Sequence, residues 1–193
     1  MENGSDEQLM ELIGREDEAA FTLLLSRHKD LVYGTIYRML GPYTSETEDI
    51  SQQVFIKVWK AAPRYRPDAQ FTTWLLTICR NCVFTQLKKS KRTQSEPLEF
   101  QGPDGEGESH HTDPGMATPS ANLLQSELAA KVESAIQQLP AAQRAALTLR
   151  QQEQLDYEQI AHIMGLSVSS VKSLLFRARE TLRTQLKEYL SAT

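Results

Sequence analysis

The sequence predicts an all-α protein made of two small helical domains joined by a flexible acidic linker. Apolar residues recur at helical spacing along most of the chain. Residues 93–126 interrupt this pattern with a segment rich in Pro, Gly, Ser and acidic residues, which cannot bury enough apolar surface to order itself. The C-terminal part has the pattern of a helix, a tight turn and a second helix. We therefore expect an N-terminal domain over 1–92, a linker over 93–126 and a C-terminal domain over 127–193.

Composition limits the functional classes. The 193 residues suffice for two small domains, and the net charge is −4. The acidic excess belongs to residues 93–126, which contain no Lys or Arg; the rest of the chain is slightly basic. There is no apolar run of membrane-spanning length, and the polar start MENGSDEQ is unlike a signal peptide. Two cysteines favour a reducing compartment. We expect a cytoplasmic protein with no membrane insertion of its own.

The first predicted helix covers 18–40. Its apolar side repeats at helical spacing, and Gly41-Pro42 ends it. His28 lies on this apolar side, with no second metal-type residue at ligand spacing. We expect a core or boundary histidine here, and we predict neither a metal site nor a cofactor.

The second predicted helix covers 46–61. Its inward stripe is Ile50, Val54, Val58 and Ala61. The opposite side carries fewer charges than a solvated face usually has, and an amide-rich face with an exposed aliphatic residue suits protein binding. The residues of this candidate face are Asp49, Gln52, Gln53 and Ile56, with Lys60 beside them.

A turn-rich connection, residues 63–70, leads to a third predicted helix over 71–92, with a possible break near Asn81. Aromatic, threonine and basic residues are mixed along it, as single-stranded DNA binding requires. A core tryptophan followed by a solvated basic tail explains the same residues equally well at this point. The basic cluster at its end consists of Lys88, Lys89, Lys91 and Arg92.

The pair Cys79 and Cys82 forms a CxxC motif within this helix. A redox enzyme needs the motif at a helix start after a buried strand, and no strand pattern precedes it. A structural zinc site needs a second ligand pair, for which only His110-His111 in the acidic segment is available. We expect unreactive packing, with a thiol switch as the alternative.

The C-terminal domain is predicted to begin with a helix over 127–139, followed by a helix from Pro140 to Arg150. The helix-turn-helix pattern then covers 156–187. Asp156 and Gln159 can cap the first helix, and Gly165 can end it in the left-handed conformation. Ser167 can cap the second helix.

The second helix of this pattern has a polar and basic outward face. Val171, Leu175, Ala178 and Leu182 form the buried stripe. Small hydroxyls followed by basic side chains suit a helix in the DNA major groove, where arginine grips guanine and lysine neutralises phosphate. An amphipathic hairpin with a solvated basic face is the simpler alternative. The candidate DNA-binding residues are Ser169, Ser170, Lys172, Ser173, Phe176, Arg177 and Arg179, with Arg183 and Lys187 further along.

These residues together resemble a bacterial RNA polymerase sigma factor of the extracytoplasmic function (ECF) type. The C-terminal match includes Leu139-Pro140, Arg144, Leu149-Arg150, Tyr157-Glu158, Ile160-Ala161, Gly165, Val171-Lys172-Ser173 and Arg177-Ala178-Arg179. The N-terminal match includes Glu48-Asp49-Ile50, Gln52, Val54-Phe55, Trp59, Phe71, Thr73-Trp74-Leu75, Ile78 and Arg80-Asn81. Two ordered blocks at the correct separation make a chance similarity very improbable.

The resemblance implies a division of roles. Asp49, Gln52, Gln53 and Ile56 are expected to bind the clamp helices of the β′ subunit of core RNA polymerase. The C-terminal helix is expected to recognise the −35 promoter element as duplex. The resemblance also implies that Asn81 and a loop after it hold a flipped base of the −10 element. The full expected −10 set is Arg80, Asn81, Lys88, Lys89, Lys91 and Arg92.

Further expectations follow from the same resemblance. An anti-sigma factor is an expected partner, and no catalytic constellation is present in the sequence, so we do not expect an enzyme. Thr72, Thr85, Leu174 and Gln154 depart from residues frequent in the family, so promoter preference cannot be transferred from relatives. The alternatives are a DNA-binding regulator without polymerase contact and a cysteine redox protein built on Cys79 and Cys82.

Overall fold

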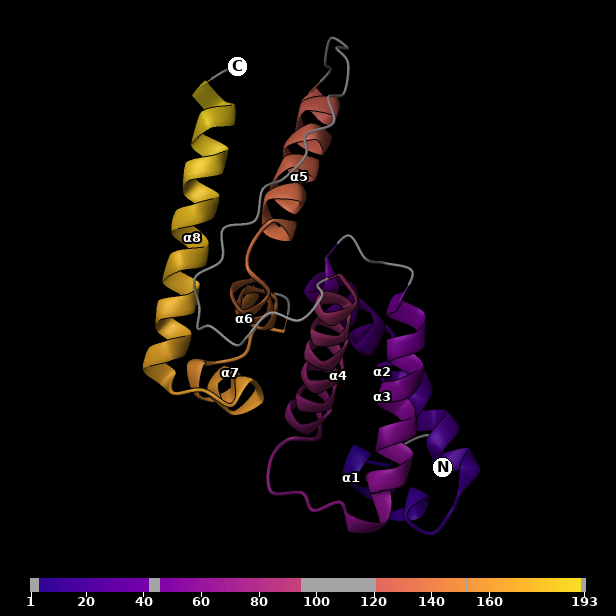
Figure 1. The fold of residues 1–193 in the computed structure, drawn as a ribbon. Helices are drawn as coiled ribbons and strands as arrows, with labels where there is room; N and C mark the ends of the chain where they lie inside the picture. Colours follow the sequence, from indigo (N-terminus) through magenta and orange to yellow (C-terminus); the bar gives the residue numbers. More distant parts are fainter. Residues whose placement is uncertain (1–3, 42–45, 95–120, 152, 192–193) are drawn as a thin grey trace.

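The structure is a computed structural model that describes residues 4–41, 46–94, 121–151 and 153–191, except the side chains of 91–94, 121–127 and 188–191. It is all-helical in these ranges, as predicted (Figure 1). The N-terminal helices are α1 (Asp6–Ile13), α2 (Glu18–Leu40), α3 (Thr47–Ala61), the short 3₁₀ helix η2 (Ala62–Arg64) and α4 (Phe71–Gln94). The C-terminal helices are α5 (Ala121–Gln137), α6 (Ala141–Gln151), α7 (Tyr157–Met164) and α8 (Val168–Ser191).

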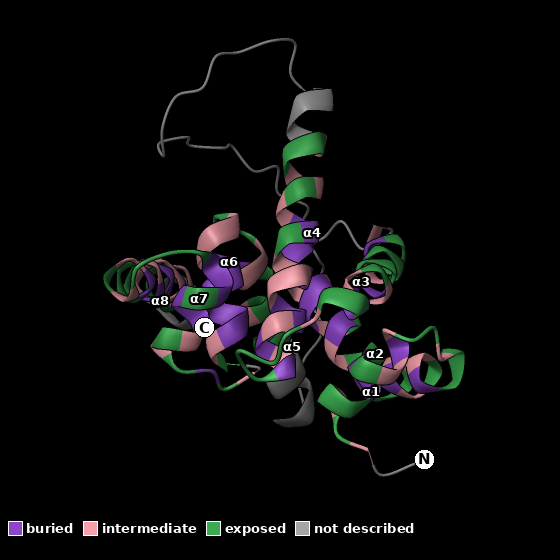
Figure 2. Ribbon diagram, turned by 90° about the horizontal axis from the view of Figure 1, so that it is seen from below, coloured by how far each residue is buried: buried purple, intermediate pink, exposed green. Residues whose placement is uncertain are grey.

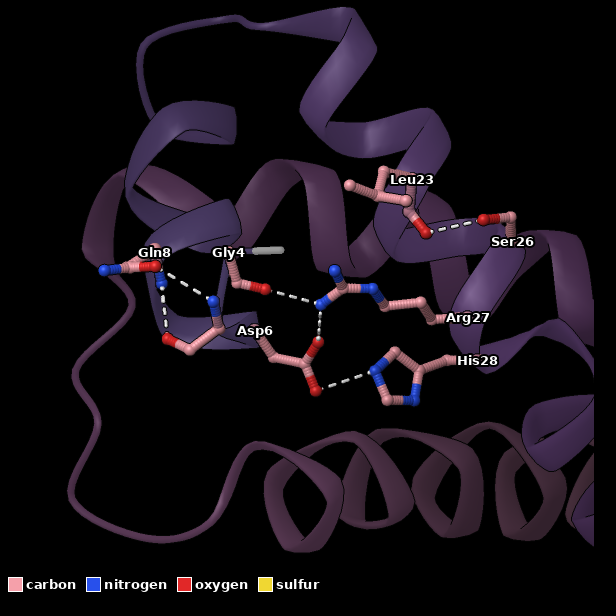
Figure 3. A network of polar contacts seen from close by, with 8 residues as sticks. Gly4, Asp6, Gln8, Leu23, Ser26, Arg27 and His28 are labelled. Atoms are coloured by element: carbon pink, nitrogen blue, oxygen red, sulfur yellow. Dashed lines mark hydrogen bonds and ion pairs between the residues drawn. The ribbon is translucent and has the colours of Figure 1, made fainter. Parts of the chain in front are cut away.

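Helix α1 was not predicted, although the sequence contains its start signal. The Ser5 side chain accepts from the Gln8 backbone, and the Gln8 side chain accepts from the Ser5 backbone, which completes a capping box. His28 Nε2 then forms a 2.9 Å hydrogen bond with the Asp6 carboxylate, which accepts it and so holds α1 against α2, and Arg27 donates to the same carboxylate (Figure 3). His28 is therefore a satisfied boundary histidine, as expected.

Helix α4 is continuous through Asn81, so the predicted break and the loop after Asn81 are wrong. The Asn81 carbonyl accepts a bond from Thr85 Oγ1, which lies one turn later in the same helix. Buried residues continue on both sides of this point, from Leu75 to Val83, so packing favours an uninterrupted helix. Sequence reasoning gave too much weight to a polar residue in an otherwise helical stretch.

The C-terminal helices begin and end close to the predicted points, with one difference. Helix α5 begins at Ala121, within the segment assigned to the linker, and packs beside α8. The expected flexible linker is otherwise residues 95–120, which lie outside the described residues. Gln154, where relatives often have Gly, has φ of 52°, which explains why glycine suits this position.

The helix-turn-helix has the predicted caps. Asp156 and Gln159 form the capping box of α7, and Gly165 has φ of 64° in the left-handed region. Ser167 Oγ accepts from the Ser170 backbone at the start of α8. The stripe of Val171, Leu175 and Ala178 is buried against the rest of the C-terminal helices, which leaves the opposite side of α8 open.

The N-terminal and C-terminal helices pack against each other. Helix α6 lies on α2, and α7 lies on α4. In Figure 2, α4 stands in the centre, with α1 to α3 on one side and α6 to α8 on the other. The buried side chains of both halves form one hydrophobic cluster from Leu9 to Ala178.

Candidate nucleic-acid and polymerase interfaces

The outward side of α8 carries the predicted duplex-binding residues. Ser169, Ser173 and Arg177 are exposed, and so are Lys172, Phe176 and Arg179; Ser170 is half-buried. Phe176 is 65% exposed, which is unusual for a side chain of its size. The buried stripe on the opposite side packs α8 against the other C-terminal helices, so the exposed face has a fixed orientation relative to the rest of the molecule.

The first turns of α8 are suited to close approach by a phosphate backbone or a base edge. Ser167 Oγ lies 2.9 Å from Ser169 Oγ and 2.8 Å from Ser170 Oγ. Beside them, the Lys172 ammonium lies 5.4 Å from the centre of the Tyr157 ring, and the Arg150 guanidinium lies 5.0 Å from it. Tyr157 thus contacts two cations, one from α6 and one from α8. Arg150 was not among the predicted binding residues.

A basic recess of about 660 Å³ lies beside the start of α4. Four cations and one carboxylate line it, so its charge favours an anionic ligand. Trp74 and Tyr65 supply aromatic surface, with ring centres 4.9 Å apart. The sequence analysis gave a −10 role to Trp74 only, through the matched block 73–75, and did not bring it together with the cations of 57–66, which were a usable signal. The polar and charged lining is Lys57, Lys60, Arg64, Arg66, Asp68 and His162.

The hydroxyl of Tyr65 is buried, although this side chain lines the recess. Its oxygen forms no hydrogen bond with the described residues. Burial, followed by the charges of Glu7, Asp6 and Asp68, raises the pKa of the Tyr65 phenol above its usual value. A tyrosine phenol is protonated at neutral pH even without this shift.

A polar stripe on α4 continues from this recess. Trp74, Thr77, Asn81, Thr85 and Lys88 follow one another at steps of three or four residues, so they share one side of the helix. Asn81 and Lys88 are exposed, and they lie about 10 and 20 Å along the helix from Trp74. The side chains of Lys91 and Arg92 lie outside the described residues. Lys89, the remaining member of the predicted cluster, is also exposed.

Arg80, one of the predicted −10 residues, forms hydrogen bonds within the protein. Its Nε donates to the Ile163 carbonyl at 2.9 Å, and its Nη1 donates to Asn81 Oδ1 at 2.8 Å. Partial burial lowers the pKa of the guanidinium from its usual value, but arginine remains charged in proteins. Arg80 therefore links α4 to the end of α7.

The predicted polymerase-binding residues form one exposed face on α3. Asp49, Gln52, Gln53 and Ile56 are all exposed, while Ile50, Val54 and Val58 on the other side are buried. Ile56 is 51% exposed, so the face combines two amides with an uncovered aliphatic side chain. This composition suits a docking surface better than a purely solvated one.

The CxxC cysteines have the surroundings of packed core residues. Cys79 and Cys82 are both buried and unbridged. Burial raises the pKa of each thiol above its usual value. Among the described residues, no group of three or more His, Cys, Asp or Glu is arranged to hold a metal ion, and no helix is long and apolar enough to cross a membrane.

Comparison with known proteins assigns both halves of the chain. Residues 24–93 match the family model for sigma-70 region 2, and residues 129–182 match the model for sigma-70 region 4. The RNA polymerase sigma-H factor of Pseudomonas aeruginosa is 36% identical over 96% of this chain and 95% of its own length. The ECF RNA polymerase sigma-E factor of Escherichia coli K12 is 31% identical over 92% of each chain.

Solved structures show the same fold. CnrH, in complex with the cytosolic domain of CnrY, has a TM-score of 0.65 at 23% identity, with 95% of this chain and 97% of that chain covered. RpoE of Bartonella quintana, in complex with the anti-sigma factor NepR, has a TM-score of 0.62 at 24% identity, with 86% and 96% covered. The two matched regions, in this order, and the full-length identity to sigma factors show that this chain belongs to the ECF family of RNA polymerase sigma factors.

Proposed function

We propose that this sigma factor binds its three partners in transcription initiation through three separate surfaces. The α8 face binds the −35 element, the recess and stripe of α4 bind the −10 element, and the α3 face binds core RNA polymerase. The observation that carries the proposal is the exposed polar and basic face of α8, opposite a fully buried stripe. Sigma factors are initiation factors and not enzymes, so the chemistry belongs to the polymerase.

The α8 face is suited to duplex DNA. Its serines allow close approach near the N-terminal end of the helix, where the backbone N–H groups favour phosphate. Arg177 lies further along and can form two hydrogen bonds with the O6 and N7 atoms of a guanine. Lys172 and Arg179 lie on the other flank of the exposed face and can neutralise phosphates.

The recess beside α4 is suited to an unpaired base and its phosphates. The free-energy cost of taking a base out of its stack must be compensated at its new site, and the Trp74 and Tyr65 rings offer aromatic surface on which a base can stack. The cations of the recess neutralise the backbone. The strand then follows the α4 stripe through Asn81 toward Lys88. This places the base site before α4, in the connection from η2, and not after Asn81.

The α3 face is proposed to bind the clamp helices of the β′ subunit. Its amides can exchange hydrogen bonds with a partner helix, and Ile56 can enter an apolar pocket. We place the protein in the cytoplasm, because promoter DNA and RNA polymerase are found in that compartment. An anti-sigma factor is a further proposed partner, since RpoE, with the same fold, was solved with one.

Run-off transcription tests the proposal. The purified chain is added to core RNA polymerase with fragments of genomic DNA, and the start sites are mapped. We expect transcripts that require the chain and share sequence elements near −35 and −10. Transcription that is the same with and without the chain would overturn the proposal.

A further inference from the structure

We infer that the basic recess beside α4 binds a free nucleoside polyphosphate, with guanine as the preferred base, and that this ligand competes with the −10 strand for the site. The competition rests on the proposed function of the recess, whereas the binding does not. A mononucleotide has the same chemistry as one unit of the strand, a planar base beside phosphate. It differs in carrying several negative charges together at one end.

The phosphate end of the site is a row of cations along α3 and η2. Lys57, Lys60 and Arg64 follow at steps of three and four residues, they are exposed, and all three line the recess. Among the described residues, neither Lys60 nor Arg64 has a carboxylate within ion-pair distance. Cations that are neighbours on one side of a helix, and are not neutralised by the protein itself, can contact successive phosphates of one chain.

The base end of the site is an aromatic platform. Trp74 is half-buried and lines the recess, so part of its ring is open to a ligand. The Tyr65 ring meets it edge to face, with ring centres 4.9 Å apart. Phe71, which is buried, lies 5.7 Å from the Trp74 ring and 6.1 Å from the Tyr65 ring. The platform is therefore held in place by packing before a ligand arrives, and stacking on it accepts any base.

Asp68 gives this platform a preference among bases. It is the one carboxylate among the described residues that line the recess. Burial is the main cause of the raised pKa of the Tyr65 phenol, and the charge of Asp68 contributes to it, so this carboxylate lies on the aromatic side. An ionised carboxylate only accepts hydrogen bonds. Guanine presents two adjacent donors, N1–H and the N2 amino group, whereas uracil presents one donor between two carbonyl oxygens.

The far side of Tyr65 determines which way the ligand lies. Tyr65 also borders a second recess, of about 390 Å³, whose charged lining is Glu7, Glu11 and Arg15. Two carboxylates and one cation disfavour phosphate there, because like charges repel. The phosphates are therefore directed toward α3 and η2, and the base toward Trp74.

The size of the recess suits a single nucleotide. Its volume of about 660 Å³ lies within the range of roughly 300–1,000 Å³ that is typical of small-molecule sites. His162 of α7 is exposed and lines the same recess, so its ring nitrogens can bond a ligand that α3 and α4 also contact. A ligand that binds only the folded protein raises the free energy of unfolding. Binding should therefore be visible in a melting curve.

Trp74 provides a direct measurement. The chain has two tryptophans, and Trp59 packs edge-on against Phe21 with ring centres 5.1 Å apart. The Trp59→Phe variant leaves Trp74 as the only tryptophan, so its fluorescence reports on the recess. This variant is titrated with GTP, with UTP and with inorganic pyrophosphate at constant ionic strength. Lys60→Ala and Asp68→Asn are added to it singly, and Lys29→Ala, at an exposed position of α2, is the control for charge.

We expect GTP to quench Trp74 saturably and to raise the melting temperature, and UTP to bind more weakly. Pyrophosphate should compete with GTP without quenching, since it has no base. Lys60→Ala should weaken GTP binding roughly tenfold, as loss of a charge-assisted contact does, while Lys29→Ala should leave it unchanged. Asp68→Asn should bring the affinities for GTP and UTP close together, although the loss of a negative charge strengthens both.

Three results would overturn the inference: no saturable quenching by GTP, equal affinities for GTP and pyrophosphate, or equal losses in Lys60→Ala and Lys29→Ala. A labelled single-stranded pool of 12 random nucleotides separates this inference from the proposed function. We expect GTP to displace the pool, as measured by fluorescence anisotropy. If GTP binds and the pool does not, the −10 role of the recess is wrong and only the competition is lost. If the pool binds and GTP does not, the nucleotide site is wrong and the −10 role stands.

Discussion

Arg177 is the side chain whose position says most about sequence recognition. It is exposed and lies next to Ala178, a member of the buried stripe of α8, so packing does not explain it. Lys172 is also exposed on α8, and its ammonium lies over the Tyr157 ring. The two cations are therefore expected to respond differently to changes in promoter sequence.

The Arg177→Ala variant should lose roughly 1–3 kcal/mol of binding on the preferred promoter and relax the choice at one base pair, because a bidentate contact to guanine is lost. The Lys172→Ala control should weaken all promoters about equally and flatten the salt dependence. Transcription from a library of −35 variants checks both. Activity that falls evenly across the library for Arg177→Ala would mean that this residue contacts only the backbone.

The cysteines provide a second prediction for single residues. Because burial raises the pKa of both Cys79 and Cys82, the thiols stay protonated at neutral pH, and the thiolate is the reactive form. A thiol reagent should label the native protein slowly at pH 8 and both residues quickly after denaturation. Rapid labelling of the native protein, together with loss of transcription on oxidation, would revive the thiol switch.

At the level of single elements, predictability followed the strength of the local signals. Helix α7 has a capping box and a C-terminal glycine, and its ends were predicted correctly. Helix α1 was missed because it has only 8 residues, and so short a helix shows too few apolar repeats for a helical period to be recognised in the sequence. The break in α4 was wrongly predicted because the stability of that helix comes from buried neighbours, which local sequence does not reveal.

The α3 face carries the prediction that belongs to this scale. Replacing Asp49 with Lys and both Gln52 and Gln53 with Ala should abolish binding to core polymerase, because the three side chains lie on one exposed side of a helix whose other side is buried. The fold should survive, as surface substitutions usually change stability by less than about 0.5 kcal/mol. Circular dichroism supplies the control. A folded triple variant that still co-elutes with core enzyme would contradict the assignment.

For the molecule as a whole, the sequence predicted the order of the helices after α1 and two candidate DNA-binding parts, but not how the helices pack. The candidate duplex-binding face could be read from the sequence because its residues lie on one helix. The recess was not, because its lining comes from α3, η2, α4 and α7. The interface between the halves depends on arginines bonded to backbone carbonyls, and a carbonyl is present at every position of a sequence. Only the spatial arrangement shows which carbonyls Arg144 and Arg80 reach.

The shared core of the two halves leads to the last prediction. A protease site inserted within residues 95–120 allows the chain to be cut while the interface stays intact. If α2 with α6 and α4 with α7 form one continuous cluster, the two fragments should remain together after cleavage and elute as one species in gel filtration. Thr35 of α2 donates a hydrogen bond to Glu153 Oε1, in the connection between α6 and α7, at 3.1 Å. The same cut in Thr35→Asp should release two separate fragments, because the added carboxylate opposes that of Glu153. Fragments of the wild type that separate at micromolar concentration would show that the halves are held near each other only by the chain that joins them.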